Sequence, residues 1–162
     1  DITTGVIKFD DCRHITPEEH AELTRRCKPE RGDILLTKVG TTGFAKAIDV
    51  DTEFSIFVSI ALLKIDQRRL SDKFTEHMLN SSRLQEYSKS GTRGVGNQNL
   101  VLKFIREFPM PAPSLNQQRR IVAYLDDLKE KVDAVKRLQS ETQAELEALL
   151  PSVLDRAFRG EL

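Results

Sequence analysis

The stretch SLNQQRRIVAYLDDLKEKVDAVKRLQSETQAELEALL, from Ser114 to Leu150, contains neither glycine nor proline. Its apolar residues recur at alternating steps of three and four, the spacing that aligns side chains along one side of a helix. This seam consists of Ile121, Leu125, Leu128, Val132, Val135, Leu146 and Leu149. A helix of roughly 35 residues is about 50 Å long, which is too long for so small a domain to bury its seam. We therefore expect a coiled-coil-forming helix that pairs with a partner helix.

Residues at the ends and in the middle of this helix indicate where it starts, where it stops and how it pairs. Ser114 is a suitable N-cap, and Gln117 is placed for the reciprocal hydrogen bond of a capping box. Gln139 and Thr142 interrupt the apolar seam, which weakens packing but can fix the register of a single partner helix. Pro151 is expected to end or kink the helix.

Residues 1–110 alternate between apolar runs and polar turns, which indicates an α/β (α+β) domain with a mixed sheet. Strands are expected at Val6–Phe9, Ile34–Val39, Phe44–Ile48 and Phe54–Ile65, of which the last is the most apolar and is expected to be a central strand. Helices are expected at 16–27, with Thr16 as N-cap, and at 71–90, where Asn80 can divide the segment in two.

The segments that follow connect this domain to the long helix. Gly91 is expected to end the second helical segment as a C-cap, and residues 91–99, with three glycines, are expected to form a loop. Residues 100–108 fit either a short helix or a strand. The proline-rich stretch 109–113 has the composition of an extended linker. The chain therefore divides into a domain at 1–110 and a linker with the long helix at 111–162.

The chain has 162 residues, and its 25 Lys and Arg balance its 25 Asp and Glu. This neutrality counts against a non-specific nucleic-acid binder but allows a local basic face. No apolar run approaches the roughly 18 residues of a membrane span, no signal peptide is visible, and two cysteines do not indicate a disulfide scaffold. We expect a cytoplasmic protein. Because the chain starts at Asp1 without an initiator Met, we also expect a fragment of a larger protein.

Two polar turns carry side chains suited to contact with DNA. Arg, Asn and Gln side chains read guanine and adenine edges, while Lys, Thr and backbone amides hold phosphates. The alternative is a pair of ordinary solvated turns. The candidate residues are Lys38, Thr41, Thr42 and Lys46 around the first turn, and Lys89, Arg93, Asn97 and Gln98 in or beside the glycine loop.

No pattern of catalytic or cofactor-binding residues is visible. The glycine spacing at 91–96 fits neither a Walker loop nor a dinucleotide-binding loop. Cys12, His14, His20 and Cys27 lack the usual spacing of zinc ligands. No nucleophile elbow, kinase signature or acid–base carboxylate pair appears. We expect a non-catalytic protein without a metal or cofactor of its own.

Several of these motifs, in this order, resemble those of the specificity subunits of type I restriction–modification systems. RGDILL at 31–36 and GTTG at 40–43 resemble their target recognition domain. So does the succession of glycine loop, PMPAP at 109–113 and QQRRIV at 117–122. The final LDRAFRGEL at 154–162 resembles the end of a long helix in this family. The likeness extends over nearly the whole chain.

The resemblance implies sequence-specific recognition of double-stranded DNA, in which each target recognition domain reads one half of a bipartite site. It implies that two long helices pair and hold two recognition domains apart, and that modification (methyltransferase) and restriction subunits assemble with them. S-adenosylmethionine, ATP and magnesium would belong to those partner subunits. This chain holds one recognition domain, whose beginning in the family precedes Asp1. A second recognition half would lie in the same chain or in the partner of a homodimer.

Two other classes of protein remain open at this point. Zero net charge suits an assembly adaptor whose helix dimerises and whose globular domain binds a protein instead of DNA. A fragment of an adenine methyltransferase is disfavoured, because the chain contains no Asn/Asp-Pro-Pro-Tyr/Phe motif and no glycine-rich cofactor loop.

Overall fold

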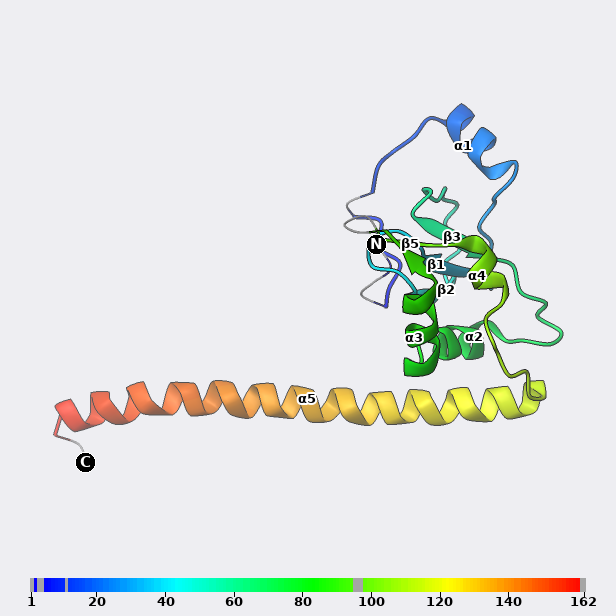
Figure 1. Cartoon of the computed structure of the whole chain (residues 1–162). Helices are drawn as coiled ribbons and strands as arrows, with labels where there is room; N and C mark the ends of the chain where they lie inside the picture. The colour runs from blue at the N-terminus through cyan, green and yellow to red at the C-terminus, as the bar shows by residue number, and fades with distance from the viewer. Residues whose placement is uncertain (1, 3–4, 11, 95–97, 161–162) are drawn as a thin grey trace. The chain divides into compact units, whose positions relative to one another are not determined.

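The computed structural model describes residues 2, 5–10, 12–94 and 98–160, and it divides into two compact units, residues 1–122 and 123–162. The helices are α1 (Pro17–Thr24), α2 (Asp72–Leu79), α3 (Ser82–Gly91), α4 (Leu102–Arg106) and α5 (Leu115–Phe158) (Figure 1). The strands are β1 (Ile34–Thr37), β2 (Ala45–Ala47), β3 (Ile60–Leu63), β4 (Thr92–Arg93) and β5 (Asn99–Leu100). The predicted α/β domain and long C-terminal helix are both confirmed.

A three-stranded antiparallel sheet with the order β2-β1-β3 forms the centre of the domain. All four residues of β1 are buried, because apolar clusters cover both faces of the sheet. Successive side chains of a strand point to opposite faces. Ile34 and Leu36 therefore pack in one cluster and Leu35 packs in the other. Burial on both faces explains why this strand reads as a continuous apolar run.

Each face of the sheet has its own cover. On one face, α2 and α3 lie side by side (Figure 1) and contribute Leu79 and Leu84 to the larger cluster. On the other face, Ile7 and Ile48 pack with Leu35. Ile7 lies in the segment 6–9 that was predicted to be a strand, and this prediction is wrong, since the segment pairs with none of the described strands. Its apolar residues cover the sheet instead of extending it.

The predicted central strand at 54–65 is also wrong. Only Ile60–Leu63 form a strand, and that strand, β3, lies at an edge of the sheet. Upstream of β3, Phe54 and Ile56 pack in the second apolar cluster from irregular backbone, and Phe54 meets Phe9 edge to face with ring centroids 5.5 Å apart. Apolar composition predicted the burial of this segment but could not distinguish a strand from a loop that packs on a sheet.

The outer edge of β2 is covered by side chains of α2 and of the residue that ends it. The Asn80 side chain accepts a hydrogen bond from the Ala45 N–H (2.9 Å) and donates one to the Ala45 carbonyl (2.8 Å). Glu76, one turn earlier, accepts from the Ala47 N–H (2.9 Å). Asn80 also separates α2 from α3, as the sequence predicted. The residue that breaks the helix therefore also satisfies an otherwise open strand edge.

The loop predicted at 91–99 contains a short hairpin in which β4 pairs antiparallel with β5. Gly91 ends α3, but it does not adopt the left-handed conformation of a glycine C-cap. A Cβ at Gly91 would collide with the Phe104 ring, which stacks on Tyr87 at 4.5 Å between centroids. Glycine is thus required here for the close approach of α4. The segment 100–108, for which helix and strand were both open, contributes Leu100 to β5 and forms α4.

Helix α1 starts as predicted, since the Thr16 hydroxyl accepts a hydrogen bond from the Glu19 N–H (3.2 Å). It ends at Thr24, before the predicted end near Cys27. The Thr24 hydroxyl donates to the His20 carbonyl (2.7 Å), and such side-chain bonds compete with continuation of a helix.

The first turn of α5 is fixed to the domain by a buried amide. The predicted capping box is confirmed, since Ser114 and Gln117 each accept from the other's main-chain N–H (3.4 and 3.0 Å to the acceptor oxygens). The Gln118 side chain is fully buried (0 % exposed). It accepts from the Ser71 N–H (2.8 Å) and donates to the carbonyls of Arg69 (2.7 Å) and Pro113 (2.8 Å). One side chain thereby joins the start of α2, the linker and the start of α5.

Helix α5 passes through Pro151 and continues to Phe158, so of the two predicted outcomes, an end or a kink at this proline, the end is excluded. A proline removes one helical hydrogen bond. Beyond Pro151, Leu154, Arg156 and Ala157 favour a helix, and an ion pair between Arg159 and Asp155 (2.9 Å) spans the last turn. The 44 residues of α5 correspond to a rod about 66 Å long.

Replacing Gln118 tests the buried joint. Gln118→Ala removes the partner of the Ser71 N–H and of the Arg69 carbonyl at a partly buried joint, so we expect the free energy of unfolding to fall by about 1–3 kcal/mol. Urea denaturation of the complete chain measures the loss. Gln143→Ala is the control, since this exposed glutamine lies on α5 and donates a hydrogen bond to the Glu147 side chain (2.7 Å) within the same helix. Equal losses in the free energy of unfolding for the two substitutions would contradict the role of Gln118 in joining α2, the linker and α5.

Candidate nucleic-acid interface

Three loops meet at one end of the central sheet. Because β1 runs antiparallel to β2 and β3, the end of β1 lies beside the starts of the other two strands. The loop 38–44 joins β1 to β2, residues 54–59 lead into β3, and the β4–β5 hairpin adjoins the loop 38–44 through the pairing of Val39 with Asn99. We call these three segments the loop end of the sheet. It gathers residues that are up to about 60 positions apart in the chain, and antiparallel pairing is what brings them together.

Main-chain hydrogen bonds join the three loops. The N–H groups of Lys38 and Val39 both donate to the Ser59 carbonyl (2.8 and 3.3 Å). The Lys38 carbonyl accepts from the Leu100 N–H (2.7 Å), and the Gly40 N–H donates to the Gln98 carbonyl (3.0 Å). Residues 38–40 therefore hold the loop before β3 on one side and the hairpin on the other.

The turn at 40–43 is also held by the residues beneath it. The Gly43 N–H donates to the Thr37 carbonyl (2.8 Å), and the Gln85 side chain donates to the Gly43 carbonyl (2.6 Å). Gly43 adopts φ = +90°, which favours glycine, and it packs on Ser88 of α3. The Thr42 and Thr92 hydroxyls are 3.0 Å apart and link the turn to β4. These contacts hold the turn at 40–43 against α3 and β4.

Most of the predicted DNA-contacting residues meet at this end of the sheet. Thr41, Arg93 and Gln98 are exposed there, while Lys38 and Thr42 are half-buried. Lys89 is exposed in the last turn of α3, directly before β4. Asn97 lies outside the described residues.

Lys46 is the exception, since it is buried (5 % exposed) in β2. Its ammonium group lies 3.0 Å from Asp49 and 3.5 Å from Glu76. Burial disfavours the charge, but the hydrogen bond to Asp49 and the charge of Glu76 outweigh this and raise the pKa of Lys46. The residue is thus a charged structural member of β2, and we leave it out of the DNA-contacting set.

Charge is distributed unevenly between the two ends of the sheet. The segments 38–44, 54–60 and 88–103 contain no Asp or Glu, and their basic residues are Lys38, Lys89, Arg93 and Lys103. At the other end, Lys64 pairs with Asp33 and Glu30 at 2.8 Å each. Zero net charge therefore conceals a basic end and an end with ion-paired carboxylates.

Sequence reasoning missed Lys103, which lies close to Arg93. Both line a shallow depression beside the hairpin whose other lining residues are Gly91, Val101, Phe104 and Glu107. The available signal was the absence of carboxylates from 88 to 103, which a search for individual motif residues overlooks. Two cations on one depression suit a phosphate group.

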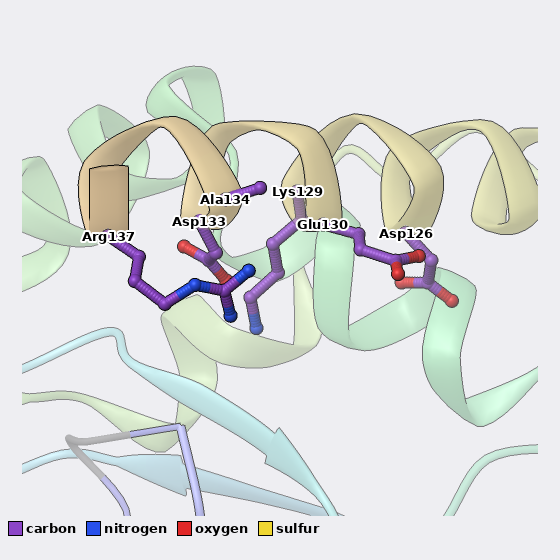
Figure 2. Close-up of a pocket in the computed structure, with 6 residues that line it drawn as sticks. All are labelled: Asp126, Lys129, Glu130, Asp133, Ala134 and Arg137. Carbon is purple, nitrogen blue, oxygen red and sulfur yellow. The ribbon is translucent and has the colours of Figure 1, made fainter. Parts of the chain in front are cut away.

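The seam of α5 is accessible. Ile121, Leu128, Val132, Val135, Leu146 and Leu149 are between 41 % and 58 % exposed, and Leu125 is half-buried. Val153 continues the same spacing beyond Pro151 and is also exposed. Figure 2 shows a hollow on a charged face of this helix, and every side chain that lines it comes from α5, namely Asp126, Lys129, Glu130, Asp133, Ala134 and Arg137. A hollow between side chains of one helix is a surface feature and not a binding cavity.

Within the described residues, no group of three or more His, Cys, Asp or Glu side chains is arranged to hold a metal ion. His20, one of the residues considered as a zinc ligand, lies with its Nδ1 atom 2.9 Å from the Ser55 hydroxyl. Among all the residues that the structure describes, no helix is both long enough and apolar enough to cross a lipid bilayer.

Comparison with known families gives an independent result. Residues 6–145 match the family described as the type I restriction modification DNA specificity domain. The chain belongs to this family. The match includes the central sheet, the loop end and most of α5.

Known relatives agree with this assignment. The specificity subunit of the type I restriction enzyme EcoBI from Escherichia coli is 27 % identical over 162 residues, which is 100 % of this chain and 34 % of that protein. A chain in a solved structure that concerns complex assembly and conformational transition of the type I restriction–modification system is 30 % identical, with a TM-score of 0.63 over 83 % of this chain and 32 % of that one.

The HsdS subunit from Thermoanaerobacter tengcongensis shares the fold, with a TM-score of 0.60 at 22 % identity over 75 % of this chain and 32 % of that one. The specificity-domain chain thus spans about a third of the length of these relatives.

Two glycines in one turn test how firmly the loop end is held. Gly40 and Gly43 both have positive φ (78° and 90°), but an added Cβ meets nothing within 4 Å at Gly40 and lies 2.8 Å from the Ser88 Cβ at Gly43. Gly40→Ala should lower the free energy of unfolding by about 1–2 kcal/mol through backbone strain alone, and Gly43→Ala should lower it further.

Urea denaturation of both variants, with and without Ser88→Gly, measures the difference. Removing the Ser88 side chain should bring the Gly43→Ala loss close to the Gly40→Ala loss. A Gly43→Ala variant as stable as Gly40→Ala from the outset would contradict the proposed packing of the turn on α3.

Proposed function

We propose that this domain reads one half of a bipartite DNA site as part of a specificity subunit, and that it does so with the loop end of the sheet. The observation that carries the proposal is the convergence of three hydrogen-bonded loops, whose segments 38–44, 54–60 and 88–103 contain four basic residues and no Asp or Glu, in a member of the specificity-domain family. Phosphate contacts need cations, and base recognition needs side chains held in fixed positions. The loop end combines both.

The exposed and half-buried polar side chains of this surface each have a role suited to their chemistry. Lys38 and Lys89 are positioned for phosphates, and Thr41 and Thr42 can add hydroxyl donors. Arg93 and Gln98, on neighbouring arms of the hairpin, have the donor and acceptor patterns that read guanine and adenine in the major groove. A neutral chain whose loop end carries only a few cations binds DNA weakly by charge alone, so the domain depends on a larger assembly for affinity.

The long helix has a separate role in this proposal. Its exposed seam pairs with the corresponding helix of a second recognition half, either in the same chain or in a homodimer, and the pair holds two DNA-reading domains apart. Modification and restriction subunits assemble with this pair in the cytoplasm. The specificity subunit is non-catalytic, and S-adenosylmethionine, ATP and magnesium are bound by those partners.

Substitutions at the loop end separate phosphate contacts from base contacts. In the complete subunit assembled with its modification subunits, Lys38→Ala should weaken binding to cognate and scrambled duplexes alike and lower the slope of log K against log salt by about 0.9. Arg93→Ala should weaken cognate binding by about 1–3 kcal/mol with a smaller effect on scrambled DNA. Fluorescence anisotropy over a salt series measures both.

Arg68→Ala is the control, because this highly exposed arginine follows β3 at the opposite end of the sheet and pairs with Asp66. If it reduced binding as much as the loop-end variants, the position of the interface would be wrong. If the unmodified complex showed no preference for any duplex, an assembly adaptor would describe the domain better.

A charge in the seam tests helix pairing. Val132→Asp places a carboxylate in an apolar contact, which should cost a few kcal/mol, whereas Ser140→Asp places one off the seam. If the helices pair between chains, sedimentation should show a smaller mass for the Val132 variant. If they pair within one chain, the mass should stay the same and the helix should melt at a lower temperature by circular dichroism. No change in either measurement would argue against pairing.

A further inference from the structure

The loop before β3 carries two apolar side chains that are directed to solvent. Phe57 is 73 % exposed and Val58 is 68 % exposed. The loop is not frayed at this point, because the Ile60 N–H donates to the Phe57 carbonyl (2.9 Å) and closes a tight turn. Phe54 and Ile56, just before it, are anchored in the second apolar cluster. The chain thus presents Phe57 and Val58 at the tip of an anchored loop, and we call this pair the apolar tip.

The apolar tip lies at the basic end of the sheet. Ser59, the next residue, accepts main-chain hydrogen bonds from Lys38 and Val39. Through Lys38 and Gly40 the same hydrogen-bonded layer reaches Leu100 and the Gln98 carbonyl of the hairpin. The tip is therefore part of the surface that carries the proposed phosphate and base contacts.

The size and surroundings of the tip decide which partner suits it. A stable protein–protein interface buries about 800 Å² on each partner and has an apolar centre, far more than two side chains provide. The segment 54–60 has no charged residue. The loop 38–44 and the β4–β5 hairpin, which belong to the same hydrogen-bonded surface, carry cations and no carboxylates, whereas Asp51 and Glu53 lie directly upstream of the segment. DNA offers a partner that combines phosphates with small apolar groups, since thymine presents its methyl group in the major groove.

We propose that Phe57 and Val58 contact thymine methyl groups in the major groove of the half-site and thereby help to select A·T pairs. This inference rests on the proposed DNA-reading function and adds an apolar component to it. Arg93 and Gln98 read hydrogen-bonding groups, while the tip reads a group that forms no hydrogen bond. The two kinds of contact together discriminate more base pairs than either does alone.

Deoxyuridine provides the test, because it differs from thymidine only by the missing methyl group. The complete subunit with its modification subunits is titrated with its cognate duplex, identified by methylation mapping, and with duplexes in which each thymine on either strand is replaced in turn. Loss of one buried methyl contact corresponds to roughly a fourfold loss of affinity. We expect such a loss at one or two positions for the unmodified complex.

Variants of the tip complete a thermodynamic cycle. Phe57→Ser should bind the thymine duplex about as weakly as the unmodified complex binds the sensitive deoxyuridine duplex, and it should no longer distinguish the two. Phe57→Leu should retain part of the discrimination. Leu23→Ser, at an exposed apolar position on α1 outside the loop end, should leave the methyl effect unchanged. Val58→Ala gives a second, milder test of the tip if Phe57→Ser fails to fold.

The outcomes separate this inference from the proposed function. If the unmodified complex prefers its cognate duplex but the deoxyuridine series is flat, the inference is wrong and DNA reading stands. The same holds if the full methyl effect persists in both Phe57→Ser and Val58→Ala. If Phe57→Ser releases the modification subunits while methyl discrimination is kept, the tip faces a protein and the inference is also wrong. If no duplex is preferred at all, the proposed function itself fails.

Discussion

The proposed interface depends on the main-chain hydrogen bonds of residues 38–40. These residues follow β1, and they bond the loop before β3 on one side and the β4–β5 hairpin on the other. Because the bonds come from the backbone, side chains on all three loops remain available for a ligand while their positions are fixed. Loops that were ordered only by DNA would lose part of the binding free energy to that ordering.

Side chains from the rest of the domain hold the three hydrogen-bonded loops and the sheet in place. Gln85 and Ser88 of α3 hold the turn at Gly43, and Asn80 satisfies the outer edge of β2. The fully buried Gln118 amide then joins the start of α5 to the same helical layer. The domain is thus continuous from the loop end of the sheet to the first turn of the long helix, and both proposed roles depend on that continuity.

Local patterns in the sequence predicted the features that depend on neighbouring residues. The α5 seam, the Ser114–Gln117 capping box and the break at Asn80 all follow from spacings of a few residues. The failures involve distant partners. Lys46 lies near a polar turn in the sequence and was therefore predicted to contact DNA, but β2 buries it in the fold, where it pairs with Asp49 and with Glu76, thirty positions later. The run at 54–65 looked like a central strand because composition shows burial and not hydrogen-bond partners. Sequence analysis missed the apolar tip and Lys103 because their possible contact with a ligand depends on which loops lie beside them in the fold.

Photocrosslinking tests most directly whether the loop end of the sheet faces DNA. The intact subunit, assembled with its modification subunits, is bound to its cognate duplex with 5-bromodeoxyuridine in place of thymidine in the half-site, irradiated and digested, and the crosslinked peptides are identified by mass spectrometry. Crosslinks should fall within residues 38–44, 54–60 and 88–103. Crosslinks confined to the opposite end of the sheet, at residues 28–33 and 64–69, would contradict the proposed mode of DNA reading.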